Sequence, residues 1–79
     1  MTQEYILNEL KIIFKQINPN IDIASVTLDT KLVEDLGLDS LTILMLSFAI
    51  EKKFEIKFSG TPKFATVGEV VEDIEILTA

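Results

Sequence analysis

The 79-residue chain is long enough for one domain, residues 1–79, and too short for two separate hydrophobic cores. It has neither cysteine nor histidine, which excludes a disulfide framework, Cys/His zinc sites and Ser-His or Cys-His nucleophile pairs. Thirteen Asp and Glu against seven Lys give a formal charge of −6, which disfavours nucleic acid as a partner and suits encounters with basic proteins.

The first predicted element is a helix over residues 4–17. Its apolar residues recur at the spacing of one helix face: Ile6, Leu7, Leu10, Ile13, Phe14 and Ile17. Thr2 is expected to cap the start of this helix. Asn18 precedes Pro19 and is therefore pushed out of helical geometry, so the helix is expected to end there.

Residues 21–38 show no sustained period and are predicted to form a long connection. Scattered apolar side chains are expected to hold it against the core: Ile21, Ile23, Val26, Leu28, Leu32, Val33 and Leu36. A short helical turn fits residues 31–36, and Gly37 is expected to adopt a backbone conformation that other residues resist. The connection is longer than most loops in small domains, which indicates a functional segment.

A second helix is predicted to begin at Asp39 or Ser40 and to end near Lys53. It has two adjacent apolar stripes, one of Ile43, Leu46, Ile50 and Phe54 and one of Leu41, Leu44, Met45 and Phe48. The second stripe has two interpretations. Either it is an exposed patch, with Leu41 and Met45 as the better candidates, or it is a second buried face of a core helix.

Residues 54–58 alternate like a strand but have no partner strand, so they are predicted to form an extended loop. Thr61-Pro62 predicts a brief helical turn through Ala65. Thr66 and Glu69 fit a capping box for the last helix, whose predicted buried stripe is Val67, Val70, Val71, Ile74 and Leu77. The predicted fold is all-α: a small four-helix bundle of three main helices and one short helix, with a long connection between helices 1 and 2.

The most informative stretch of the sequence is Asp35-Leu36-Gly37-Leu38-Asp39-Ser40-Leu41. It closely resembles the attachment motif of the acyl carrier proteins. The resemblance extends to Val26-Thr27, Leu32-Val33-Glu34, Phe54, Ile56 and Thr66-Val67, and so covers nearly the whole chain. It implies that Ser40 carries 4′-phosphopantetheine, transferred from coenzyme A by a phosphopantetheinyl transferase.

A carrier of this kind holds acyl groups as thioesters and delivers them to enzymes of fatty acid, polyketide or related biosynthesis. It is not itself an enzyme. Because this chain has no thiol, the thiol of a thioester carrier must arrive on the prosthetic group. Asp39 is expected to cap the helix, to help the transferase recognise the serine, or to do both.

The departure from the family lies along the second helix, where typical fatty-acid carriers place several acidic residues. Here Thr42, Met45 and Ser47 are expected on its exposed or half-exposed turns. The acyl-transfer and acyl-processing enzymes are therefore expected to recognise Glu34, Asp35, Leu41 and Met45. The wall of an acyl pocket in the core is expected to include Leu46, Phe64, Ala65 and Val67, although plain packing would also explain these residues.

Three other functions compete with that of an acyl carrier. A peptidyl carrier domain usually has Gly-Gly before the Asp or His that precedes the serine, and Leu38-Asp39 fits the acyl type better. The second alternative is a helical interaction module without a cofactor. The third is an enzyme that binds a metal through carboxylates, but no group of Asp and Glu residues here has the spacing of an EF-hand calcium loop. The sequence also shows no signal peptide and no membrane-spanning stretch, so we expect a cytoplasmic monomer without membrane insertion.

Overall fold

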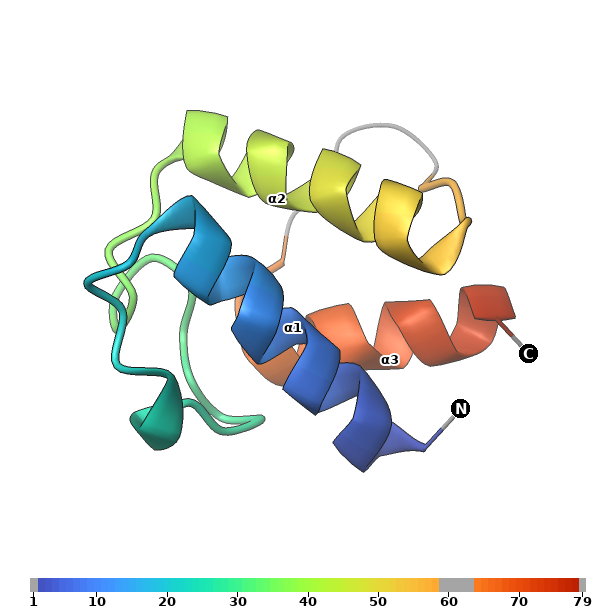
Figure 1. Cartoon of the computed structure of the whole chain (residues 1–79), viewed down its shortest axis with the longest axis horizontal. Coiled ribbons are helices and arrows are strands. Elements are labelled where there is room, and N and C mark those ends of the chain that lie inside the picture. Colours follow the sequence, from blue (N-terminus) through green and yellow to red (C-terminus); the bar gives the residue numbers. More distant parts are fainter. Residues whose placement is uncertain (1, 59–63, 79) are drawn as a thin grey trace.

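The computed structural model describes residues 2–58 and 64–78, and this part of the chain forms three α-helices and one short 3-10 helix. They are α1 (Gln3–Ile17), η1 (Ile23–Ser25), α2 (Ser40–Phe54) and α3 (Val67–Thr78). Helix α1 crosses the molecule and packs against both α2 and α3 (Figure 1). The all-α prediction is confirmed. The short helix predicted to open at Thr61-Pro62 lies outside the described residues, and η1 was not predicted.

Helix α1 begins and ends where the sequence predicts. The Thr2 hydroxyl accepts a hydrogen bond from the Tyr5 amide at 3.1 Å, which satisfies one of the unpaired N–H groups of the first turn. At the other end, the extended residue Asn18 donates its amide to the Phe14 carbonyl at 2.9 Å. The buried face consists of Ile6, Leu10, Ile13 and Phe14. Its side chains form the centre of the core.

Helix α2 buries Leu46, Ile50 and Phe54 and is followed by its C-cap, Glu55, whose φ of 55° is left-handed. Ser47 was expected to be exposed or half-exposed, and that expectation is wrong because it is 2% exposed. Its hydroxyl donates a hydrogen bond to the Leu44 carbonyl at 2.7 Å. A serine can be buried in a helix when its hydroxyl is satisfied by the preceding turn in this way.

Helix α3 has the predicted cap. Thr66 accepts a hydrogen bond from the Glu69 amide at 3.3 Å, and the Glu69 carboxylate accepts one from the Ala65 amide at 2.8 Å. Val67, Val70, Val71 and Ile74 are buried, as predicted. Leu77 was predicted in the same stripe but is 43% exposed. At this end of α3, the Gln3 side-chain amide donates a hydrogen bond to the Glu75 carboxylate at 2.9 Å.

The long connection is fastened to the start of α3 by three backbone hydrogen bonds, which we call the clasp. Leu32 donates to the Ala65 carbonyl at 3.0 Å, Val67 to the Thr30 carbonyl at 2.9 Å and Gly68 to the Leu28 carbonyl at 2.8 Å. Of the predicted anchors, Ile21, Val26 and Leu32 are buried and Ile23 and Leu36 are partly buried, whereas Leu28 and Val33 are exposed.

The end of the connection is a series of hydrogen-bonded turns that delivers the chain to α2. The Asp35 amide donates to the Lys31 carbonyl at 3.0 Å and the Gly37 amide to the Val33 carbonyl at 3.0 Å. Gly37 has a φ of 68°, which confirms the predicted left-handed backbone. Leu38 is buried next to it. The turn predicted over residues 31–36 is therefore present and fixes the start of α2.

Candidate functional site

Ser40 is the first residue of α2 and is exposed, but it is not the residue that caps the helix. The cap is Asp39, whose Oδ1 accepts a hydrogen bond from the Thr42 amide at 2.8 Å. This bond to the Thr42 backbone, followed by one to the Thr42 side chain, lowers the pKa of Asp39 below its ordinary value. Because Asp39 performs the capping, the Ser40 hydroxyl remains available at the surface.

The acidic residues before the serine lie in the turn that leads to it, and both Glu34 and Asp35 are exposed. The Asp35 carboxylate accepts a hydrogen bond from the Lys31 amide at 2.8 Å, so it also stabilises the turn. The Lys31 ammonium lies 3.2 Å from Glu34. The predicted acidic residues thus lie in the turn that leads to Ser40, and Lys31 partly neutralises one of them.

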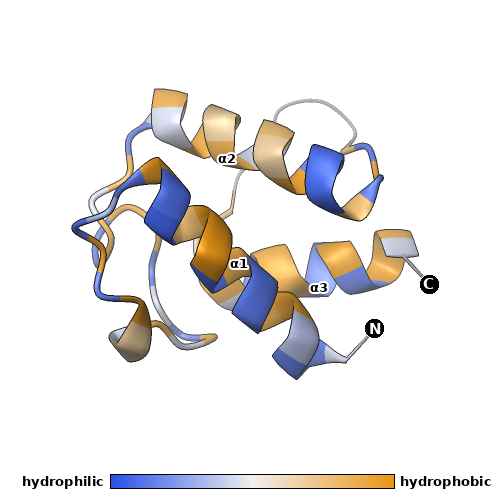
Figure 2. Ribbon diagram, viewed as in Figure 1, coloured by the Kyte–Doolittle hydropathy of each residue, from blue (hydrophilic) through white to orange (hydrophobic). Residues whose placement is uncertain are grey.

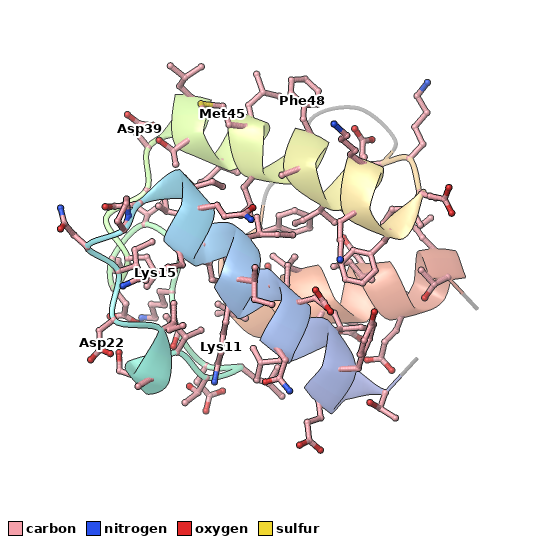
Figure 3. The ribbon with its side chains drawn as sticks, in the orientation of Figure 1. Lys11, Lys15, Asp22, Asp39, Met45 and Phe48 are labelled. Carbon is pink, nitrogen blue, oxygen red and sulfur yellow. The ribbon has the colours of Figure 1, made fainter. Side chains whose placement is uncertain are left out.

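The second apolar stripe of α2 is largely exposed. Leu41 is 66%, Met45 52% and Phe48 60% exposed, while Leu44 is partly buried. Figure 3 shows Met45 and Phe48 pointing away from α1 on the outer side of α2, with Asp39 at its start. The exposed-patch interpretation therefore holds for three of the four side chains. Phe48 belongs to it as clearly as the two residues that the sequence favoured.

Three of the four predicted pocket residues, Leu46, Phe64 and Val67, are buried in the core. The prediction for Ala65 is wrong, because Ala65 is exposed and lines a surface cavity of about 260 Å³ beside Glu34. Its carbonyl belongs to the clasp, and this places the residue at the rim of the fold. Phe58, which was not among the predicted pocket residues, packs beside them, since its ring meets that of Phe64 edge-on with centroids 5.5 Å apart.

An exposed serine at a capped helix start, on a small helical scaffold, is the site expected of a carrier domain. Comparison with known proteins supports the assignment of this chain to that class. Residues 9–74 match a family model described as "Phosphopantetheine attachment site". The acyl carrier protein of Helicobacter acinonychis is 47% identical over 58 residues, which cover 71% of this chain and 74% of that protein. That of Wolinella succinogenes is 41% identical over 73 residues, covering 89% and 93%. The acyl carrier protein of onion yellows phytoplasma is 44% identical over 54 residues, covering 66% and 71%.

The chain belongs to the acyl carrier proteins, the carrier family with a phosphopantetheine attachment site. It is a carrier rather than an enzyme, and its prosthetic group is 4′-phosphopantetheine. It interacts with a phosphopantetheinyl transferase and with acyl-processing enzymes. Within residues 2–58 and 64–78, no helix is long and apolar enough to cross a membrane.

Proposed function

We propose that the Ser40 hydroxyl is the attachment point of the phosphopantetheine arm. The observation that supports this proposal most directly is at the start of α2, where Asp39 caps the helix and Ser40 is exposed. A phosphodiester on Ser40 would lie beside the first-turn amides, where the helix dipole favours a negative group by roughly 0.3–1 kcal/mol. The residues present therefore fit the group, whose thiol holds the acyl cargo.

We also propose roles for the residues around Ser40. Asp39 holds the first turn of α2 and presents its second carboxylate oxygen to the transferase. Glu34 and Asp35 attract basic partner surfaces, and Leu41 and Met45 make the apolar contacts. Such a division is expected because charges at the edge of an interface act mainly on association, whereas buried apolar side chains govern dissociation.

For the cargo, we propose that Leu46, Phe64 and Val67 form the apolar surroundings into which a medium-length acyl chain folds back. Their support is their position, since all three lie in the core shared by α2 and α3. We further propose that residues 1–79 act as one carrier domain, monomeric and cytoplasmic, in fatty acid synthesis or a related pathway. Of these proposals, the attachment of the arm to Ser40 has the most direct test.

That test is loading. The purified apo chain is incubated with coenzyme A and a broad-specificity phosphopantetheinyl transferase, and intact mass is measured. We expect one arm per chain on wild type, one arm on Ser25→Ala and none on Ser40→Ala. Ser25 is the matched control because it is also an exposed serine, in η1. An arm that persists on Ser40→Ala, or maps to another serine by peptide mass, would refute the assignment.

A further inference from the structure

The exposed face of α2 does not end at Phe48. Leu41, Met45, Phe48 and Lys52 follow one another at spacings of four, three and four residues, so they share one side of the helix. All four side chains are exposed. We call these four residues the α2 stripe. It is apolar over its first three members and cationic at the fourth.

The two ends of the α2 stripe carry opposite charge. Asp39, with Glu34 and Asp35 before it, stands at the amino end, while Lys52 stands about 18 Å beyond Ser40 along the helix axis. Figure 2 shows the same polarity, with a largely hydrophobic ribbon over most of α2 and a hydrophilic segment in its last turns. No charged residue interrupts the sequence between Ser40 and Ile50.

The charge of Lys52 is not compensated by its acidic neighbours. Among the described residues, the ion pairs are Lys31–Glu34 and Lys53–Glu9, so Lys52 has no carboxylate partner there within 4.0 Å. Glu51 is engaged elsewhere, since its carboxylate accepts a hydrogen bond from the Phe58 amide at 2.8 Å.

Lys52 also borders a hollow between α1 and α2. The cavity measures about 420 Å³ and has Ile12, Ile13 and Ala49 in its lining, with Lys52 and Lys53 beside them. Ile12, on the α1 side of this hollow, is 52% exposed. If a partner inserted an apolar side chain into this hollow, the polar groups of the partner next to that side chain would lie close to Lys52.

From this polarity we propose that the acyl-processing enzymes served by this carrier dock on the α2 stripe with a surface of reversed polarity. That surface is basic near the entrance for the arm, apolar opposite Leu41, Met45 and Phe48, and bears a carboxylate that pairs with Lys52. The inference rests on the proposed function of Ser40. Turning α2 end for end would place like charges together at both ends, so the polarity fixes the direction in which the helix lies and directs the arm toward the active site.

The test uses the acyl-loaded holo-carrier as substrate for acyl-processing enzymes purified one at a time from the organism that makes it. The key variant is Lys52→Glu, and its matched control is Lys57→Glu, which makes the same charge change at an exposed residue beyond the helix. Phe48→Ala has a similar control in Ile76→Ala, because Ile76 is 67% exposed on α3. Lys52→Gln removes the charge without placing an anion at the helix end, in case Lys52→Glu is too unstable to assay.

We expect Lys52→Glu to lower kcat/KM about 10-fold through KM, with less effect at high salt, and Lys57→Glu to change it less than about 2-fold. Phe48→Ala should raise KM and Ile76→Ala should leave it unchanged. Equal or higher kcat/KM for Lys52→Glu would overturn the inference, because it would mean that partners present a basic surface along the whole helix. Loading is measured first by mass, so a wild type that accepts no arm would instead refute the proposed function.

Discussion

At the scale of single residues, the site depends on two neighbours that have separate tasks. Serine is itself a good helix cap, and a capping serine would have its hydroxyl committed to a backbone amide. Here the Asp39 carboxylate accepts the Thr42 amide, and Ser40 follows as the first helical residue. The polar group that holds the helix start is thus different from the group proposed to carry the arm.

This separation predicts a pH dependence that belongs to Asp39. Its pKa is lowered in the folded state, so its contribution to stability is fully present above its unfolded pKa, near 3.8, and is lost as pH falls through the folded value. Asp39→Asn keeps a capping oxygen but does not titrate. We expect the melting temperature of wild type to fall relative to Asp39→Asn as pH is lowered below about 4. Thermal melts by circular dichroism from pH 7 to pH 2.5 measure this. A constant difference between the two proteins over that range would show that the bond to Thr42 does not favour the carboxylate.

Two residues show where prediction from the sequence stops at this scale. Ser47 was expected to be exposed or half-exposed, but a bond to its own helix lets it be buried. Ala65 was expected in the core, but the clasp places it at the surface. The Asp39 cap and the left-handed Gly37 were predictable because both features depend on neighbours within four residues.

At the scale of elements, α2 differs from α1 in leaving three large apolar side chains in solvent. Leu41, Met45 and Phe48 are each more than half exposed in the folded chain, so any further burial of these side chains would come from a partner. Burying a side chain of this size contributes about 1.5–3 kcal/mol relative to full exposure. If partners dock on this face as proposed, the carrier gains this burial in the complex while its own core stays unchanged.

The clasp gives an element-scale prediction at Gly68. Replacing a helical glycine by alanine usually stabilises, by up to about 1 kcal/mol. At Gly68, however, a Cβ atom would lie 2.9 Å from the Leu28 carbonyl oxygen, which is backbone and accepts the Gly68 amide. We expect Gly68→Ala to destabilise the fold by about 1–3 kcal/mol in chemical denaturation. Glu72→Ala, at an exposed position of the same helix, serves as the control and should change stability by less than about 0.5 kcal/mol. Stabilisation by Gly68→Ala would mean that the connection can shift away from α3 without cost.

The three main helices were predictable because each has a 3.6-residue apolar period and a capping residue of its own. The path of the long connection was not, because its decisive bonds join residues about 35 positions apart and leave no local pattern. The 3-10 helix η1 was missed for a different reason. It spans only three residues, too few to show an apolar period, and is held by hydrogen bonds that Asp22 accepts from Ala24 and Ser25.

At the scale of the whole molecule, one core is shared by the three helices, the connection and Phe64. The proposed surroundings of the acyl chain, Leu46, Phe64 and Val67, belong to this core rather than to a separate compartment. A cargo that enters it therefore becomes part of what holds the fold together. The thermal stability of the folded chain should therefore depend on which acyl group it carries.

We expect the octanoyl form of the carrier to melt at a higher temperature than the holo form, because a ligand that binds only the folded state stabilises it. A net gain of about 1 kcal/mol would raise Tm by roughly 4–8 °C in a domain of this size. The malonyl form is the control, since its carboxylate would be costly to bury and should leave Tm near that of the holo form. Differential scanning calorimetry on the three forms measures this. Equal Tm for the octanoyl and holo forms would place the chain in solvent.

The clasp has one further consequence, which concerns topology. By joining residues 28–32 to residues 65–68, it closes a ring of about 35 residues that contains the whole of α2. Closing such a ring has an entropic cost, which arises once, when the clasp forms. This cost increases only with the logarithm of the number of residues in the ring. While the clasp holds, both ends of this segment stay joined to the rest of the fold. The helix that bears Ser40 is thus held in place both by the closed ring and by its own buried side chains, Leu46, Ile50 and Phe54.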